Sequence, residues 1–279
     1  MLSILVSVII PSYNEQGVIG ACLSSLALQS YKSIEIILVD DGSSDKTLEV
    51  VKKYKVKVVK QNHKGPGPAR NLGASFAKGK ILVFVDSDMT FEKDFINDLI
   101  LPIINGKTIG TFSKNEMNAN KNNIWSVCWS INRNWPKDRL IPPDYPNQAP
   151  VFRAILKEEF DRVGGFDATG EYTDDWSLSR KLGVKSTFAS GAVYYHFNPS
   201  TLREVYRQAR WIGKNEFISG SFYRQLRSLV LYSFPVSFLI GLFKSIKSSD
   251  FHFLIFKFIY DFAVWISVIR SFFGENKSK

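Results

Sequence analysis

Four short apolar runs, each rich in Val, Ile and Leu, lie in the first 90 residues of the chain. Between them are longer stretches in which apolar residues recur at a helical period. The expected strands are residues 4–10, 34–39, 56–59 and 81–85, and the expected helices are residues 15–29, 45–53 and 68–77. Strands that alternate with helices predict an α/β fold with a mostly parallel sheet and right-handed crossovers.

Acid-bearing turns follow three of these strands, at the edge where parallel sheets bind their ligands. The turns read PSYNE (11–15), DDGSSD (40–45) and DSD (86–88). In the last turn Asp86 and Asp88 bring two like charges close together, which costs free energy unless the carboxylates share a cation. A solvated acidic turn is the alternative, but the convergence of three such turns on one sheet edge favours a binding site.

The other turns also carry groups that suit a nucleotide. Asp40 and Asp41 can accept hydrogen bonds from a base or a ribose hydroxyl, and Gly42 permits a tight turn. Helix capping is the alternative, and it suits Ser44 and Asp45 better.

A Gly/Pro-rich loop, residues 63–80, opens a predicted helix that carries Arg70. A helix N-terminus with a nearby arginine suits phosphate. The loop is neither a Walker A loop, because no Gly-Lys-Ser/Thr follows, nor a dinucleotide loop, because it follows the third strand rather than the first.

The chain changes character near residue 220, which predicts a division into residues 1–220 and residues 221–279. Two apolar runs follow, residues 228–243 and residues 251–273. The first is short for a membrane span and the second contains Lys257 and Asp261, which a span disfavours. An interfacial or re-entrant hairpin is therefore expected, with a buried helical subdomain or a dimer interface as alternatives. Basic residues flank the runs: Arg224, Arg227, Lys244 and Lys247.

Composition narrows the function classes. The 279 residues carry a net charge of +10, which favours anionic partners such as phosphates or lipid headgroups. The basic residues are scattered and no nucleic-acid-binding motif is present, so no nucleic-acid partner is expected. Cys22 and Cys128 have no metal-ligand spacing and fit a reducing compartment. The apolar N-terminus lacks a basic region and a cleavage site, and is expected to be a strand rather than a signal peptide.

The motifs VSVIIPSYNE, ILVDDGSSDKT, GPARNLGASFAKGKILVFVDSDM, VGGFD and TDDWSLSRKLG occur in this order. Together they resemble the family 2 glycosyltransferases, inverting enzymes with the GT-A fold. The resemblance runs from about Ser7 to Trp211, and the apolar tail is similar to that of membrane-bound members.

The resemblance implies roles for individual residues. The Asp-Asp-Gly-Ser turn would hold the nucleobase and ribose, and the Asp-x-Asp turn would bind a divalent cation, Mn²⁺ or Mg²⁺, and the diphosphate of a nucleotide-sugar. The residues implied at the nucleotide-sugar site are Pro11, Tyr13, Glu15, Asp40, Asp41, Arg70, Asp86 and Ser87. The implied metal ligands are Asp86, Asp88 and His196.

The catalytic base is implied in the TDDW segment. Aligning Leu178 with the family's apolar position puts the base at Asp175, the favoured register, whereas aligning Arg180 puts it at Asp174. An inverting transfer needs one carboxylate that takes the proton of the acceptor.

Two further stretches are expected near the acceptor. The family's basic and tryptophan element corresponds to Arg207, Arg210 and Trp211, although an amphipathic helix explains it almost as well. Residues 111–150 show little helical or strand signal and predict a long functional loop. Its tryptophans could stack on a sugar or meet a lipid chain: Trp125, Trp129 and Trp135.

The sequence therefore predicts a metal-dependent, inverting glycosyltransferase at the cytoplasmic face of the cell membrane, peripheral or integral through its C-terminal region. A UDP- or GDP-type donor and a lipid-linked or glycan acceptor are expected. A polyprenyl-phosphate sugar synthase and a non-catalytic nucleotide-sugar-binding homologue are the alternatives.

Overall fold

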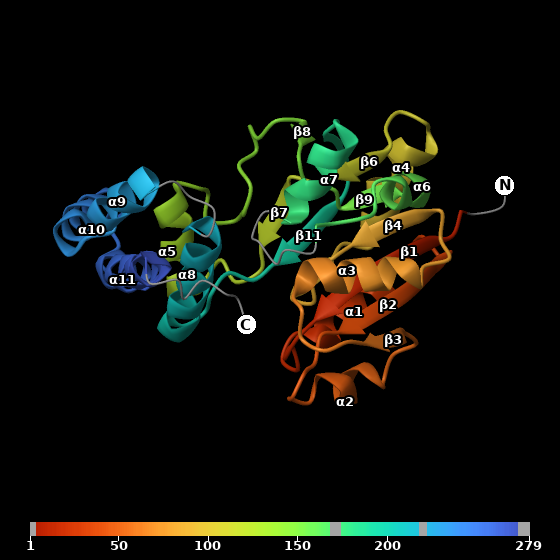
Figure 1. Ribbon diagram of the computed structural model, residues 1–279, viewed down its shortest axis with the longest axis horizontal. Helices are drawn as coiled ribbons and strands as arrows, with labels where there is room; N and C mark the ends of the chain where they lie inside the picture. The colour runs from red at the N-terminus through yellow and green to blue at the C-terminus, as the bar shows by residue number, and fades with distance from the viewer. Residues whose placement is uncertain (1–3, 168–173, 218–221, 273–279) are drawn as a thin grey trace. The chain divides into compact units, whose positions relative to one another are not determined.

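The computed structural model describes residues 4–167, 174–217 and 222–272. Its contacts divide the chain into two compact units (Figure 1). The first comprises Met1–Met117 and Ile141–His196, and the second comprises Asn118–Leu140 and Phe197–Lys279. The second unit starts before residue 220, because helix α8 (Leu202–Phe217) packs against helix α11 (His252–Phe272). The expected functional division at residue 220 stays a prediction.

The first unit is built on an eight-stranded sheet in the order β3-β2-β1-β4-β9-β6-β10-β8. Its first four strands are parallel and confirm the four predicted runs. Their bounds are β1 Val6–Ser12, β2 Ile34–Asp40, β3 Lys57–Lys60 and β4 Ile81–Phe84. The remaining strands are β6 Gly110–Phe112, β8 Gln148–Ala149, β9 Ala154–Leu156 and β10 Ser186–Phe188, with β9 antiparallel to both of its neighbours.

Helices cover both faces of this sheet, so the central parallel strands β1 and β4 are buried on both sides, whereas β3 at the edge is largely exposed. Val8 and Ile10 of β1 belong to one core cluster, and Ile9 between them belongs to another, as the two-residue period of a strand requires. Gly73 lets α3 approach closely, because a Cβ there would lie 2.5 Å from Ile9 Cγ2. The helices of this unit are α1 Ile19–Ala27, α2 Thr47–Val51, α3 Pro66–Ser75, α4 Phe95–Ile104, α6 Lys157–Arg162 and α7 Asp174–Leu182.

A second, three-stranded sheet has the order β5-β11-β7. The strands are β5 Met89–Phe91, β7 Asn115–Asn118 and β11 Val193–His196. The antiparallel register of β11 on β5 pairs His196 with Met89, the residue after Asp88. The ladder thus carries a histidine from late in the chain to the acidic turn after β4.

The expectation of a largely structureless loop over residues 111–150 is wrong. Helix α5 (Ile124–Arg133) lies within it, and Asn123 caps the helix by accepting hydrogen bonds from the Trp125 and Ser126 amides. Trp129 is buried, with its ring 6.0 Å from that of Phe256 between centroids, so it belongs to the core of the second unit rather than to a sugar site.

The two apolar runs near the C-terminus form α9 (Phe222–Leu231), α10 (Phe234–Ser248) and α11 (Figure 1). Pro235 lies in the first turn of α10, where its missing N–H leaves no bond unmade, instead of in the middle of one long run. Among the described residues, one helix segment, His252–Arg270, has the length and apolar composition of a membrane span. Helices α9 and α10 reach that length only as a pair, bent by 56°.

Candidate active site

The acidic turns of the first unit converge on a cavity of about 350 Å³ at the carboxyl ends of β1, β2 and β4. Most of the residues expected at the nucleotide-sugar and metal sites line it. They are Pro11, Tyr13, Glu15, Asp41, Asp86, Ser87, Asp88 and His196. The convergence expected from the strand ends is therefore present in the fold.

One end of the cavity combines an aromatic pair with the Gly-rich loop. The rings of Tyr13 and His63 lie 4.1 Å apart between centroids. Asp41 accepts hydrogen bonds from the backbone amides of Lys64 (2.8 Å) and Gly65 (2.9 Å), and this holds the loop against the sheet. No sequence motif identifies His63 as a site residue.

Asp40 has a different position from the one expected. It is buried, it is absent from the cavity lining, and its carboxylate accepts a hydrogen bond from the Ser43 amide (3.1 Å). Its observed contact therefore closes the turn after β2.

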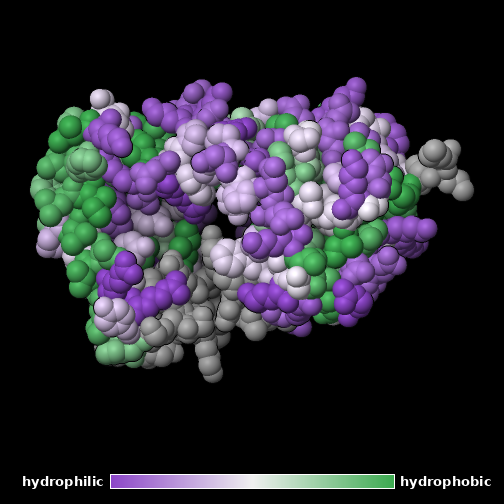
Figure 2. Space-filling view, turned by 90° about the horizontal axis from the view of Figure 1, so that it is seen from above, coloured by the Kyte–Doolittle hydropathy of each residue, from purple (hydrophilic) through white to green (hydrophobic). Residues whose placement is uncertain are grey.

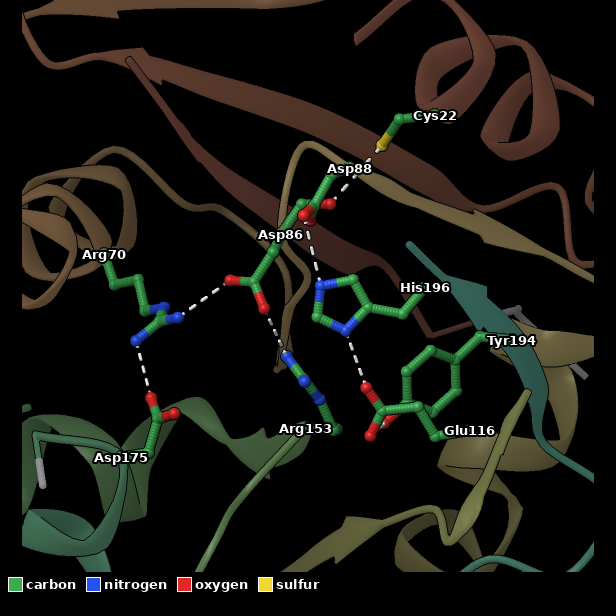
Figure 3. A network of polar contacts seen from close by, with 9 residues as sticks. All are labelled: Cys22, Arg70, Asp86, Asp88, Glu116, Arg153, Asp175, Tyr194 and His196. Carbon is green, nitrogen blue, oxygen red and sulfur yellow. Dashed lines mark hydrogen bonds and ion pairs between the residues drawn. The ribbon is translucent and has the colours of Figure 1, made fainter. Parts of the chain in front are cut away.

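Two arginines form ion pairs with the carboxylate of Asp86 (Figure 3). Arg70 Nη2 lies 2.8 Å from one carboxylate oxygen and Arg153 Nη1 lies 3.2 Å from the other. Burial would raise the pKa of Asp86, but Arg153 and Arg70 hold it well below its ordinary value. Both oxygens are thus paired with guanidinium groups, and the role of Asp86 as a metal ligand stays a prediction. Arg153 follows no motif, and nothing in the sequence pattern identified it.

Arg70 also reaches the predicted base. Its Nη1 lies 2.6 Å from Oδ1 of Asp175, in the first turn of α7. The Asp175 side chain remains 42% exposed, so it is accessible to a substrate. Asp174 begins the same helix, but its side chain lies outside the described part of the chain.

His196 lies between two carboxylates (Figure 3). Its Nε2 is 3.1 Å from Oδ2 of Asp88, and its Nδ1 is 2.7 Å from Oε1 of Glu116 on β7. The hydroxyl of Tyr194 donates to the other oxygen of Glu116 (2.9 Å). Burial would lower the pKa of His196, but Asp88 and Glu116 raise it well above its ordinary value. Glu116 stands in a polar stretch without a recognisable motif, so no sequence signal identifies it.

The pair of Asp88 and His196 fits a divalent cation. Neighbouring ligands of one octahedral ion with bonds of about 2.1 Å lie about 3 Å apart, close to the observed separation. A metal-binding histidine commonly gives its other ring N–H to a carboxylate, the position that Glu116 occupies. Within the described ranges, no group of three His, Cys, Asp or Glu side chains could hold a metal, so diphosphate and water would have to complete the shell.

Two buried polar atoms of this region have no hydrogen-bond partner among the described residues. One is Oγ of Ser12, which lines the cavity, and the other is Nε of Arg70, which does not line it. The charged form of Glu15 is disfavoured, because burial and the charges of Asp88, Asp45 and Asp86 raise its pKa to about 7. Buried polar groups are normally paired, so these groups suit a site that a polar ligand completes.

A second, smaller cavity of about 140 Å³ lies next to the first one, in the same unit. Asp175, Arg153, Glu116, Tyr194 and Tyr145 are among its lining residues. The Asp86–Arg153 and His196–Glu116 pairs each join a residue of the first cavity to a residue of the second. The predicted base therefore has a pocket of its own beside the nucleotide-sized one.

The expected acceptor-side residues belong to the second unit. Arg207 and Trp211 are exposed on α8, and Arg210 is half-buried. Their role stays a prediction.

Comparison with known families identifies the fold. The family model described as glycosyl transferase family 2 matches residues 7–164. The chain belongs to this family. The family and the GT-A-type fold predicted from the motifs are confirmed, and the same matched segment contains both Asp-rich turns and the Gly-rich loop.

Curated glycosyltransferases match this chain over segments of different length. The probable glycosyltransferase YdaM of Bacillus subtilis is 29% identical over 253 residues, covering 80% of this chain and 58% of YdaM. The poly(ribitol-phosphate) β-N-acetylglucosaminyltransferase TarS of Staphylococcus aureus is 40% identical over 100 residues, covering 33% of this chain and 18% of TarS. The matches thus span less than two thirds of the length of these curated relatives.

Solved structures share the fold at low identity. The mannosyltransferase PcManGT of Pyrobaculum calidifontis, in complex with GDP-Man and Mn²⁺, has a TM-score of 0.62 at 18% identity and covers 100% of this chain and 89% of its own. Residues 1–349 of S. aureus TarS, in complex with UDP-GlcNAc, give a TM-score of 0.56 at 19% identity and cover 96% of this chain and 92% of their own.

Proposed function

We propose that this family 2 glycosyltransferase moves a sugar from a nucleoside-diphosphate donor to an acceptor, with inversion and with a divalent cation. The observation that carries the proposal is the ion-paired chain from Asp175 through Arg70 to Asp86, which joins the predicted base to the edge of the nucleotide-sized cavity. The donors bound by TarS and PcManGT, UDP-GlcNAc and GDP-Man, support a nucleotide-sugar of one of these types.

The residues divide the chemistry between them. Asp175 accepts the proton of the acceptor hydroxyl while that oxygen forms its bond to the anomeric carbon. The bond from that carbon to the diphosphate breaks, and the electron pair leaves with the nucleoside diphosphate. Arg70 stands between Asp86 and Asp175 and holds the base carboxylate by one oxygen. A cation held by Asp88 and His196 would supply neutralising charge to the leaving diphosphate.

The first test is ligand binding. The melting temperature is measured with UDP, GDP, CDP and dTDP, each with and without Mn²⁺. A ligand at about 100 times its dissociation constant adds about 2.7 kcal/mol to the folded state. A shift for one nucleotide that depends on Mn²⁺ and is lost in Asp88→Asn is the expected result; the absence of any shift contradicts the donor proposal.

The acceptor is tested through the base. Loss of a general base reduces transfer to a hydroxyl by roughly 10² to 10⁴. Asp175→Asn is therefore expected to abolish transfer to a lipid-linked or glycan hydroxyl while nucleotide binding survives. A nearly silent Asp175→Asn favours a polyprenyl-phosphate acceptor, whose phosphate needs no strong base. Binding without turnover on any acceptor supports a non-catalytic homologue.

A further inference from the structure

Helix α10 has its polar and apolar faces reversed relative to a helix of a water-soluble bundle. Its buried residues are Ser237, Gly241 and Ser245, spaced four apart on one face. Its large apolar side chains are instead exposed: 72% for Phe234, 65% for Leu239 and 67% for Phe243. A soluble amphipathic helix buries the apolar stripe and exposes the small polar one.

Helix α9 shows the same reversal. Ser228 is its buried residue, whereas Phe222 and Val230 are 66% and 64% exposed. Figure 2 shows hydrophobic residues gathered on the helices of this unit. A cavity of about 300 Å³ lies between α10 and α11, and Phe234, Phe258, Phe262 and Trp265 are among its lining residues.

The inner side of α10 is held by polar contacts that are buried from solvent. Lys257 and Asp261 of α11 form an ion pair of 2.8 Å, with side chains only 8% and 1% exposed. The hydroxyl of Ser237 donates to the other oxygen of Asp261 (2.6 Å). Small residues where helices meet and paired charges turned into the bundle are typical of helices in lipid, where the apolar side chains face outward.

The charge of the segment is equally one-sided. Residues 217–249 contain no Asp or Glu, but they contain Arg224, Arg227, Lys244 and Lys247. Arg227 and Lys247 are exposed. Basic residues beside an apolar surface complement the anionic headgroups of a bilayer.

The other side of the same unit is suited to water. Helix α11 packs against α8, which carries exposed Arg203, Arg207 and Gln208 among its polar residues.

Helix α10 has only 15 residues, about 22 Å at 1.5 Å per residue, and falls short of a hydrocarbon core of about 30 Å. One face of the unit thus matches lipid and the other matches water.

We propose that the outward faces of α9 and α10 insert into one leaflet of an anionic bilayer, so that the second unit is a monotopic membrane anchor. The inference rests on the second unit alone, so its failure and a failure of the proposed transferase activity are distinguishable. The lipid-facing side chains are Phe222, Val230, Phe234, Leu239 and Phe243, with Arg227 and Lys247 at headgroup level.

The test uses the full chain, purified in mild detergent and added to preformed phosphatidylcholine vesicles with or without phosphatidylglycerol. Flotation measures the partition coefficient. The variant Leu239→Ser/Phe243→Ser is expected to lower it at least tenfold. The matched control Leu28→Ser/Phe76→Ser changes the same residue types, 70% and 42% exposed in the first unit, and is expected to stay within twofold of the unsubstituted chain.

The charge and the depth are tested separately. Arg227→Gln/Lys247→Gln is expected to weaken binding to the anionic vesicles at least fivefold and to leave binding to neutral vesicles unchanged.

His252→Cys, at the start of α11, is expected to react with a membrane-impermeant maleimide added outside the vesicles. The natural residues Cys22 and Cys128 are buried and provide the unreactive background.

Three results would overturn the proposal. Equal partitioning of the two double variants would mean that the apolar face does not meet lipid. A detergent-solubilised dimer that Leu239→Ser/Phe243→Ser converts to a monomer, with vesicle binding unchanged, would assign the face to a second copy of the chain. Protection of His252→Cys inside the vesicles would indicate a spanning hairpin.

Discussion

Asp86 and Asp88 stand one residue apart, yet their surroundings predict opposite consequences for the same substitution. Asp86 has both oxygens engaged by arginines whose side chains are 8% and 14% exposed. Asp88 contacts His196 at 3.1 Å and is 34% exposed. We therefore expect Asp86→Asn to act mainly on stability and Asp88→Asn mainly on cation binding.

The magnitude follows from burial. Removing one partner of a buried ion pair costs about 3–5 kcal/mol. Asp86 is 30% exposed, so solvent screening favours the lower end, about 3 kcal/mol. At roughly 2–4 °C per kcal/mol, Asp86→Asn is expected to lower the melting temperature by roughly 6–12 °C. Asp88→Asn is expected to lower it by no more than about 2–4 °C, because a partly exposed pair contributes about 1 kcal/mol or less.

The assay combines thermal unfolding with Mn²⁺ binding, followed by the electron paramagnetic resonance signal of the free ion in the presence of UDP or GDP. Asp86→Asn is expected to retain Mn²⁺ binding below its melting temperature, and Asp88→Asn to lose it. Retained stability together with lost Mn²⁺ binding in Asp86→Asn would refute the reasoning and return Asp86 to the metal ligands.

Three further predictions follow from buried charges. The pKa of Glu15, raised to about 7, means that the folded state binds a proton more tightly than the unfolded state, so the unfolding free energy falls as pH rises from about 4.5 to 7. Urea midpoints measured across this window should fall less steeply in Glu15→Gln; an identical slope would contradict the assignment. Glu116→Gln should weaken Mn²⁺ binding roughly 10- to 100-fold, because Glu116 orients His196, and an unchanged dissociation constant would exclude that role. Asp261→Asn leaves Lys257 buried without its carboxylate and should destabilise the second unit by about 3 kcal/mol, measured by denaturation in detergent; a loss below about 1 kcal/mol would show that the pair is solvated.

The sequence by itself determined the central sheet. The runs that form β1, β2 and β4 are rich in β-branched and other apolar residues, and such local patterns identify parallel strands before any contact is known. It also determined that the turns at 11–15, 40–45 and 86–88 would meet, because the carboxyl ends of parallel strands share one edge. Helix α5 was missed although its caps, Asn123 and Asn134, were present in the sequence.

Only the tertiary structure decided which side chains meet. Asp86 is paired with Arg153, 67 positions away, and His196 with Glu116, 80 positions away, and no local pattern encodes such contacts. The sequence also did not show that α10 buries its small polar residues and exposes its large apolar ones, because an apolar run with interspersed serines can bury either face. Packing against α11 selected the serine and glycine face, since Asp261 needs the Ser237 hydroxyl and Gly241 leaves room for Leu254. Hydrophobic patterns are local and specify elements, whereas the partners of buried charges depend on topology, which brings distant residues together.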